Sequence, residues 1–413
     1  MKREVKPSAI RGRVQAPPSK SYAQRAIAIA AMAEGRSEIL YPGSSDDVLA
    51  AINVVKQMGA GVDVTERGLV ISGGLSLPHA ALDCGEAGLS IRMFSAVASV
   101  FDKPVTLSGK GSLLRRPMNV VEESLRAMGV KCSTNDGYLP LTVHGPVIGG
   151  VAEVDGSFSS QVLTGMLIVA SYAKDDVRII VNNLKSRPYI DITLNVMESF
   201  GVVAENIGYN EFIVQNGQKY IPRRYVVEGD WSGAAFLLVA GAIGGEVVVD
   251  NLEISSPQAD RAITEALERA GAIVSYGKQE VTVSKGHLKA FEFDATHCPD
   301  LFPPLVSLAA YCMGETKISG ASRLIHKESN RAATLRQEFA KLGVKINVED
   351  DLMTISGGGC RSGSVHSHDD HRIAMACAVA ATAAEGPVII GGAGAVAKSW
   401  PGFFEDLEKL IEK

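Results

Sequence analysis

Hydrophobic and polar residues follow one another along this chain in a repeated order. In the stretch 176–215, the β-branched run Val177 to Val181 predicts a strand, and a polar segment ends it. Apolar residues then recur at Ile192, Val196 and Phe200, which is helical spacing, and two short strands come after this helix. The stretch therefore predicts a strand, a polar loop, an amphipathic helix and a strand pair.

The same order returns along the rest of the chain. With the copy at 176–215 there are six copies at a spacing of roughly 70 residues, which indicates an internal repeat. The other five begin near these positions, the last of them truncated: Ser37, Lys103, Gly245, Gly314 and Gly386.

A second helix, apolar on nearly all sides, precedes each copy. A helix of this kind belongs inside a packed core. The predicted ranges are Lys20 to Ala33, Gly88 to Val100, Ser159 to Ala173, Ser232 to Ala242, Asp300 to Met313 and Asp370 to Ala384.

Length and composition agree with this pattern. The chain has 413 residues, more than one hydrophobic core usually spans, so we expect two domains of three repeats each. Hydrophobic residues make up 46% and charged residues 21%, as in an ordinary soluble globular protein. The six cysteines include no C-x-x-C pair, so the sequence predicts neither a disulfide framework nor a zinc site.

The chain carries no sign of export or of membrane insertion. Its first residues, MKREVKPSAIRG, lack the apolar run of a signal peptide, and no apolar segment reaches the roughly 20 residues that cross a bilayer. A net charge of -5 argues against a general affinity for nucleic acid, which needs a basic surface. We therefore expect a cytoplasmic protein, with neither a membrane nor a nucleic acid as its partner.

Cationic residues nevertheless gather at equivalent points of the repeats, beside turns and helix starts. Free backbone N–H groups and the helix dipole favour anions there, so these residues predict a site for a small polyanion. Taken singly, each could be a solvated surface charge. They are Lys20 and Arg25, Arg115 and Arg116, Lys185 and Arg187, Lys327 and Arg331, Arg372, and Lys398.

The first of these helix starts, APPSKSYAQR, combines hydroxyls with cations. Ser19 is a candidate N-cap, and Ser21 and Arg25 fall four residues apart on one helix face beside Lys20. The glycine-rich loop of a Walker motif is absent, so an ATPase is not favoured. The segment predicts a phosphate or carboxylate site.

Other segments of the first half offer similar chemistry. Gly88 in CGEAGLSIR would let a ligand approach the backbone closely, although a glycine at a helix start is more often turn chemistry. Arg116 lies in a glycine-containing loop and suits two-pronged recognition of a carboxylate or phosphate. The segments SFSSQ and SRPYID offer hydroxyl and amide groups for a sugar-like ligand, or simple helix capping.

The two acids that are candidates for proton transfer lie in the second half of the chain. Asp300 opens an apolar helix, where an Asp is commonly only an N-cap. Glu328 lies between the cations Lys327 and Arg331, so it is either a poised acid or base or part of a surface ion pair.

The segment HSHDDH matches the H-x-H-x-D-H pattern of metallo-β-lactamase-like hydrolases. No histidine follows His371 to complete such a site, so we expect no bound metal. The informative feature is instead that Asp370, His371 and Arg372 lie at the start of a buried helix.

Nine motifs, in their order along the chain, resemble those of the 5-enolpyruvylshikimate-3-phosphate synthase (EPSP synthase) family: SKSYAQR, GEAGLSIR, RRPM, SSQ, SRPYIDIT, EGDWSGAAF, HKESNR, DDHRIAMA and KSWPGFF. The resemblance covers essentially the whole chain. It implies a two-domain inside-out α/β barrel with six βαβαββ-type repeats, three per domain, and buried helices. The implied domains are 14–225, and 1–13 with 226–413, with the active site in the cleft between them.

The resemblance also implies a reaction of the shikimate pathway, which leads to the aromatic amino acids. The enolpyruvyl group of phosphoenolpyruvate moves to the 5-hydroxyl of shikimate 3-phosphate, and phosphate is released. No metal or organic cofactor is needed, and we expect a monomer. In this family the inhibitor glyphosate competes with phosphoenolpyruvate and fits only where the position of Gly88 has no side chain.

The family roles carry over to matching residues of this sequence. Asp300 would take the hydroxyl proton, and Glu328 with Lys20 would handle the proton at C3. The implied contacts with shikimate 3-phosphate are Lys20, Ser21, Arg25, Ser159, Ser160, Gln161, Ser186, Tyr189, Asp300 and Lys327. The implied contacts with phosphoenolpyruvate are Lys20, Gly88, Arg116, Gln161, Arg331, Arg372 and Lys398.

The sequence departs from the commonest family pattern at four positions: Leu89 replaces Thr, Glu86 and Arg323 each replace Asn, and Asn330 replaces Asp. Two other functions share part of this pattern. The related UDP-N-acetylglucosamine enolpyruvyl transferase commonly has a reactive Cys in the loop before its Arg-Pro pair, and the corresponding stretch Gly109 to Arg116 has none. A non-catalytic anion-binding protein would have no reason to keep both acids.

Overall fold

The computed structural model describes residues 1–157, 159–325 and 327–411. The chain forms two compact units, which we describe separately: unit 1 is Met1–Pro17 with Glu228–Lys413, and unit 2 is Pro18–Val227. The first crossing was expected near Arg13. Strand β2 (Ile10–Gln15) continues beyond that residue and pairs with β15 (Gly245–Asp250) as far as Gln15, so the chain leaves unit 1 only after Pro17.

Unit 2 contains three four-stranded sheets among its described residues. In each, the central strand pairs in parallel with one edge strand and antiparallel with a hairpin. The first sheet has the order β14 (Arg224–Val226), β3 (Gly35–Leu40), β5 (Gly68–Gly73), β4 (Gly61–Thr65). The second has β6 (Ala81–Asp83), β7 (Pro104–Ser108), β9 (Tyr138–His144), β8 (Lys131–Asn135). The third has β10 (Gly150–Asp155), β11 (Val177–Asn182), β13 (Glu211–Val214), β12 (Glu205–Ile207).

Two sets of helices accompany these sheets. The buried set is α1 (Lys20–Met32), α3 (Gly88–Val97) with its extension η1 (Ala98–Val100), and α5 (Ser160–Ala170). The amphipathic set is α2 (Asp46–Gln57), α4 (Asn119–Ala127) and α6 (Arg187–Ser199), and the short helix η2 (Gly111–Arg115) precedes α4. Side chains of β11 alternate between buried and exposed, so one face of its sheet packs on the helices.

Unit 1 repeats this arrangement with one change. Its first sheet has the order β16 (Ile273–Tyr276), β17 (Glu280–Ser284), β15, β2. The second has β18 (Glu292–Asp294), β19 (Glu315–Ser319), β21 (Leu352–Ser356), β20 (Lys345–Glu349). The third, as far as the described residues go, has three strands: β1 (Lys2–Val5), β23 (Val388–Gly391), β22 (Gly363–His366). Strand β1, from the N-terminus, takes the antiparallel place that a hairpin fills in the other sheets, because the last repeat is truncated.

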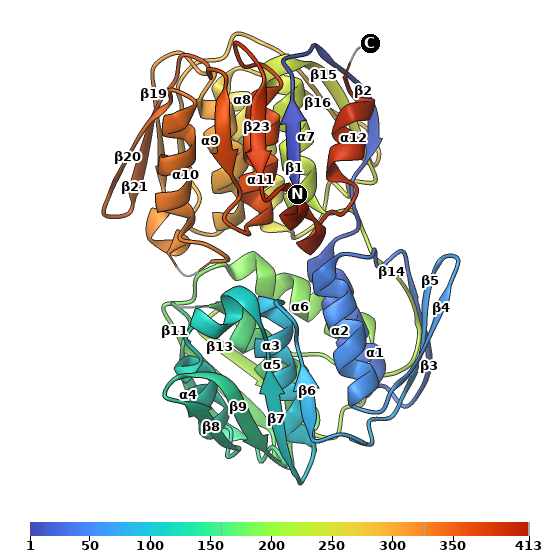
Figure 1. The fold of residues 1–413 in the computed structure, drawn as a ribbon. Helices are drawn as coiled ribbons and strands as arrows, with labels where there is room; N and C mark the ends of the chain where they lie inside the picture. The colour runs from blue at the N-terminus through green and yellow to red at the C-terminus, as the bar shows by residue number, and fades with distance from the viewer. Residues whose placement is uncertain (158, 326, 412–413) are drawn as a thin grey trace. The chain divides into compact units, whose positions relative to one another are not determined.

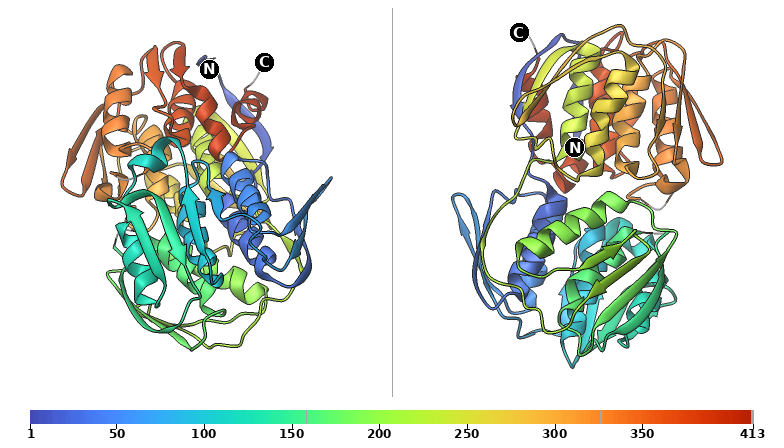
Figure 2. Two further views of the ribbon diagram at one scale, coloured as in Figure 1. Left: turned by 60° about the horizontal axis from the view of Figure 1, so that its bottom comes forward. Right: turned by 180° about the vertical axis from the view of Figure 1, so that it is seen from behind.

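The buried helices of unit 1 are α7 (Trp231–Gly244), α9 (Phe302–Ala309) and α11 (His371–Ala381), and they pack against one another. Figures 1 and 2 show them running side by side between the sheets. The outer helices are α8 (Ile263–Ala270), α10 (Arg331–Lys341) and α12 (Phe403–Lys409). Four short helices complete the unit: η3 (Ala259–Ala262), η4 (Pro299–Leu301), η5 (Ala321–Leu324) and η6 (Ala393–Lys398).

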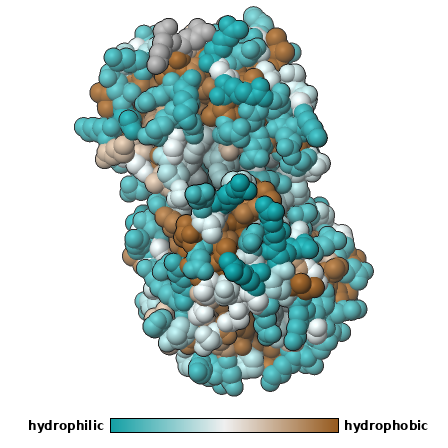
Figure 3. All heavy atoms as spheres, turned by 90° about the vertical axis from the view of Figure 1, so that its right-hand side faces the viewer, coloured by the Kyte–Doolittle hydropathy of each residue, from teal (hydrophilic) through white to brown (hydrophobic). Residues whose placement is uncertain are grey.

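Each unit has its own apolar core, centred on its three buried helices. The face drawn in Figure 3 is mostly hydrophilic, with apolar atoms in small groups. No helix among the described residues is long and apolar enough to cross a membrane. All six cysteines lie within the described ranges, and each is buried as a free thiol.

The structure confirms the six repeats and the six apolar helices, and it corrects the end of one of them. The helix expected to continue to Met313 begins as η4 and ends at Ala309, because Met313 already pairs with Lys289 in a β-bridge.

Candidate active site

Lys20 is the first residue of α1 in unit 2. Its Nζ donates a hydrogen bond of 2.6 Å to Oδ2 of Asp47, which lies in the first turn of α2. Both side chains are largely buried, at 15% and 11% exposure. Ser19 is the N-cap residue of α1, as the sequence suggested, although its side chain makes no capping hydrogen bond. Asp47 was not predicted, because only the fold brings α2 to the start of α1.

Arg25 lies one turn further along α1 and is almost fully buried. Its guanidinium donates to the carbonyl oxygens of Ser21 (2.8 Å) and Tyr189 (3.2 Å), and to the hydroxyls of Thr193 (2.9 Å) and Thr164 (3.1 Å). All four acceptors are neutral, and burial lowers the pKa of Arg25 to about 10. A buried cation held only by neutral groups gives this end of unit 2 a positive potential that favours an anion.

Gly88 and Arg116 lie against each other. A Cβ added to Gly88 would fall 2.5 Å from Nη1 of Arg116, closer than two such atoms can approach. Arg116 is 8% exposed, and its buried Nε and Nη1 have no hydrogen-bond partner among the described residues. Since a buried unpaired guanidinium nitrogen is costly, this geometry is suited to receiving an anion.

The predicted polar residues at the next helix starts have mixed roles. Ser159 caps α5 by accepting a bond of 3.2 Å from the Gln161 backbone N–H, and Ser160 is the first residue of that helix. The Gln161 side-chain oxygen accepts from Arg92 on α3 at 3.2 Å, so its amide NH₂ remains the group that can donate to a ligand. The bond from Arg92 was not predicted, because the hydrophobic pattern of α3 indicates only a buried helix.

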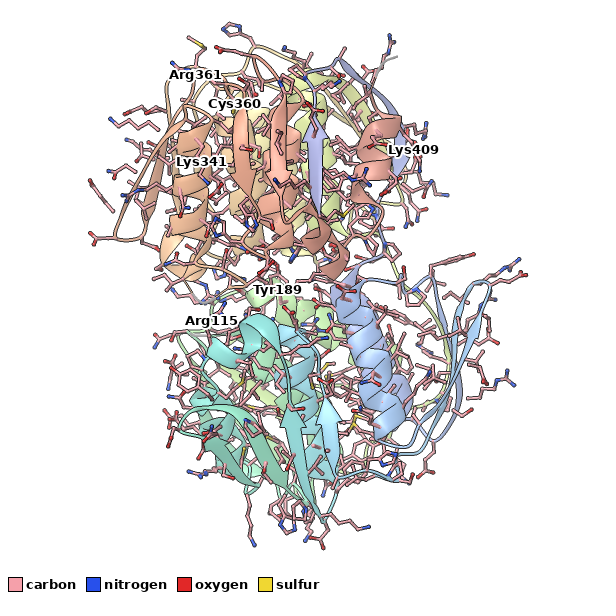
Figure 4. The ribbon with its side chains drawn as sticks, viewed as in Figure 1. Arg115, Tyr189, Lys341, Cys360, Arg361 and Lys409 are labelled. Carbon is pink, nitrogen blue, oxygen red and sulfur yellow. The ribbon has the colours of Figure 1, made fainter. Side chains whose placement is uncertain are left out.

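Ser186 and Tyr189 belong to the start of α6, where Tyr189 is labelled in Figure 4. Ser186 is buried and has a φ of 55°, in the left-handed region that a non-glycine residue rarely adopts. Such strain often marks a functional residue, and nothing in the sequence predicted this conformation.

Asp300 is the centre of the charged group in unit 1. Its Oδ1 accepts hydrogen bonds from Lys327 Nζ at 3.2 Å and from Arg331 Nη1 at 2.8 Å. Its Oδ2 accepts one from Arg372 Nη2 at 3.1 Å. Burial lowers the pKa of Lys327, although the charge of Asp300 acts in the opposite direction. Asp300 is therefore the shared partner of three cations and not merely an N-cap.

Arg331 joins this group to two further acids. It donates to Glu328 Oε2 at 2.6 Å and to both carboxylate oxygens of Asp370, at 2.8 and 3.2 Å. Burial opposes its charge, but Asp370, Glu328 and Asp300 together raise the pKa of Arg331. Asp370 also caps α11 by accepting from the Arg372 backbone N–H at 3.0 Å. The expected arrangement of Glu328 beside cations is thus present, inside a buried network.

Asp260 on η3 was missed by the sequence analysis. It is 1% exposed, its Oδ2 accepts from the Ser232 hydroxyl, and its Oδ1 has no partner among the described residues. Burial and the nearby charge of Asp300 raise its pKa to about 7, while Arg372 acts in the opposite direction. Its sequence context gave no signal, since an Asp in a polar turn is usually exposed.

Lys398, at the end of η6, is 8% exposed. Its Nζ donates to the backbone oxygen of Asp369 at 3.3 Å, next to Asp370 in the loop before α11. The expected cations of unit 1 therefore lie around the loop before α11 and the carboxylate of Asp300.

Solved structures with a similar fold identify the class of protein. An EPSP synthase from Acinetobacter baumannii superposes with a TM-score of 0.84 and 27% identity, covering 99% of this chain and 98% of its own. The enolpyruvyl transferase NikO from Streptomyces tendae shares the fold, with a TM-score of 0.79 at 18% identity, over 98% and 96% of the two chains. The fold is that of the enolpyruvyl transferases.

Sequence comparison narrows this class to one family. The family model for EPSP synthase (3-phosphoshikimate 1-carboxyvinyltransferase) matches residues 5–407. A 3-phosphoshikimate 1-carboxyvinyltransferase of Thermococcus kodakarensis is 41% identical over 98% of each chain. One from Clostridium perfringens is 38% identical, over 98% of this chain and 97% of its own. The chain belongs to the EPSP synthase family, which confirms the resemblance of its motifs and the expected fold class.

Proposed function

We propose that this protein transfers the enolpyruvyl group of phosphoenolpyruvate to the 5-hydroxyl of shikimate 3-phosphate and releases phosphate. Family membership over nearly the whole chain supports this reaction. The observation that carries it at the level of residues is the group around Asp300, in which one carboxylate contacts three cations. The product would serve the synthesis of aromatic amino acids.

The assignment of Asp300 as the base follows from charge. With no ligand present, Asp300 forms ion pairs with Lys327, Arg331 and Arg372. The phosphate and carboxylate of phosphoenolpyruvate would share these cations and so loosen their hold on Asp300, which could then accept the hydroxyl proton.

In the first half of the reaction, the 5-oxygen attacks C2 of the enol while C3 gains a proton, and the hydroxyl proton passes to Asp300. In the second half, C3 loses a proton, the bond between C2 and the phosphate oxygen breaks, and the leaving phosphate takes up the proton that Asp300 holds. We assign the protons at C3 to Glu328 and Lys20, because each has a short bond to an oppositely charged group that can compensate its change in charge.

Substrate binding is assigned to both units. In unit 2, the buried charge of Arg25, with Ser21, Ser159, Ser160, Ser186 and Tyr189, would hold shikimate 3-phosphate, and Gln161 would serve both substrates. The residues that the family roles assign to phosphoenolpyruvate are, within unit 2, Gly88 and Arg116 and, within unit 1, Arg331, Arg372 and Lys398. The unpaired nitrogens of Arg116 support this assignment most directly. The alternative UDP-sugar reaction is not favoured by the family match or by the absence of a Cys between Gly109 and Arg116.

The experiment is the release of phosphate by the purified protein. It should require both substrates together, and Asp300→Ala should reduce turnover by roughly two to four orders of magnitude. Asp250, another acid of unit 1, pairs with Arg13 outside this group, so Asp250→Ala is the matched control and should keep normal turnover. Near-normal activity in Asp300→Ala would contradict its role, and phosphate release from phosphoenolpyruvate alone would contradict the reaction.

A further inference from the structure

The segment HSHDDH has a role in the structure that neither a metal site nor the proposed chemistry explains. It forms the loop between β22 and α11. Two successive residues in it, His368 and Asp369, have φ angles of 52° and 58°, in the left-handed region. Left-handed backbone is strained for a non-glycine residue, so surrounding contacts must stabilise this shape.

Glu338 supplies those contacts from α10. Its side chain is fully buried. Its Oε1 lies 2.8 Å from Nε2 of His368, and its Oε2 accepts the backbone N–H of His366 at 2.8 Å. The backbone N–H of His368 in turn donates to Nδ1 of His366 at 2.9 Å. One buried carboxylate thus anchors His366 and His368.

Glu338 is held in its charged form. Lys341, one turn along α10 and labelled in Figure 4, donates to its two oxygens at 2.8 and 2.7 Å. Burial acts in the opposite direction, but the bonds from Lys341, His368 and the His366 backbone keep the pKa of Glu338 below its ordinary value. The anchor is therefore a charge-assisted one, which is stronger than a bond between neutral groups.

The other side of the same loop contacts the cations of the candidate site. The backbone oxygen of Asp369 accepts from Lys398, and the carboxylate of Asp370 accepts from Arg331 and from the Arg372 backbone. Three cations that we assign to phosphoenolpyruvate thus take their positions from the residues that directly follow His368.

We propose that Glu338 and His368 are positioning residues for phosphoenolpyruvate: they fix the left-handed loop that sets Lys398, Arg331 and Arg372. The proposal rests on the proposed function, since it takes these three cations as the binding set. Neither residue touches the substrate in this account. Their loss should therefore weaken the binding of one substrate and leave the other unaffected.

The main variant is His368→Phe, which keeps a ring of similar shape but cannot bond to Glu338. The His368 side chain is 36% exposed, so the fold should tolerate the change. We expect the KM for phosphoenolpyruvate to rise roughly tenfold, as for the loss of a charge-assisted bond, while the KM for shikimate 3-phosphate stays nearly constant. In His368→Gln, the amide can donate to Glu338 in place of Nε2 and should restore most of the affinity.

Lys341→Met is the matched control. It removes one donor to the same carboxylate but leaves the bonds from His368 and the His366 backbone that anchor the loop, so the KM for phosphoenolpyruvate should change little. Equal increases in both KM values, or a lower melting temperature with unchanged KM values, would show that the Glu338 contacts only stabilise the fold and would overturn the inference. A wild-type protein without turnover would overturn the proposed function together with it.

Discussion

Asp260 is a buried acid that should cost the folded protein stability. Its pKa of about 7 is higher than the ordinary Asp value of 3.8 by roughly three pH units. Each pH unit corresponds to about 1.4 kcal/mol, so ionisation of Asp260 destabilises the folded state by up to roughly 4 kcal/mol. Asp260→Asn keeps the shape of the side chain and an oxygen for the Ser232 hydroxyl, while it removes the charge.

The difference in stability between wild type and Asp260→Asn depends on pH. Below about pH 4 the carboxyl is protonated in both the folded and the unfolded chain, so wild type and Asp260→Asn should have similar stability. As pH rises toward 7, only the unfolded chain loses the proton, and wild type loses stability relative to the variant. Above pH 7 the variant should be the more stable protein by the full amount.

Unfolding in urea, followed by tryptophan fluorescence, measures this difference in stability for unit 1, which contains Asp260. The two tryptophans, Trp231 and Trp400, both lie in unit 1 and are buried, so their signal reports that unit alone. Asp250→Asn is a control of opposite sign: Arg13 lowers the pKa of Asp250, so that variant should be less stable than wild type at neutral pH. A difference between Asp260→Asn and wild type that is the same at pH 5 and pH 8.5, or a less stable variant at pH 8.5, would refute the reasoning.

Two further predictions concern Gly88 and Leu89 at the start of α3, and both are checked by steady-state kinetics. In Gly88→Ala the new Cβ must displace the guanidinium of Arg116, so the KM for phosphoenolpyruvate should rise roughly tenfold with little loss of stability; an unchanged KM would contradict the assigned role of Arg116. In Leu89→Thr, inhibition by glyphosate should strengthen more than the KM for phosphoenolpyruvate changes, because Leu89 is a bulky, buried residue next to Gly88 and, in the proposed site, would obstruct the longer inhibitor first. Equal inhibition before and after the substitution would show that Gly88 alone determines the sensitivity to glyphosate.

The repeats were predictable from the sequence because each carries its own local pattern. The run Val177 to Val181 and the helical spacing after it suffice to predict β11 and α6, and the other copies follow the same logic. The end of α9 was not predictable, because the β-bridge between Met313 and Lys289 is a tertiary contact.

The cations of the candidate site were found because they recur at helix starts. Their partners were harder to see. Asp47 and Asp260 become partners of Lys20 and Ser232 only through the fold, since 27 and 28 residues separate each pair. The left-handed conformation of Ser186 likewise has no sequence signal, because Ser is common in ordinary helix caps.

In the proposed reaction, the bond between C2 and the phosphate oxygen of phosphoenolpyruvate breaks, and the 5-oxygen of shikimate 3-phosphate replaces that oxygen on C2. Phosphoenolpyruvate carrying a heavy oxygen isotope at the bridging position, with mass spectrometry of both products, shows whether this bond breaks. The isotope should leave entirely in the phosphate, and shikimate 3-phosphate should gain the mass of an enolpyruvyl group. Isotope retained in a pyruvate product, with shikimate 3-phosphate unchanged, would exclude enolpyruvyl transfer.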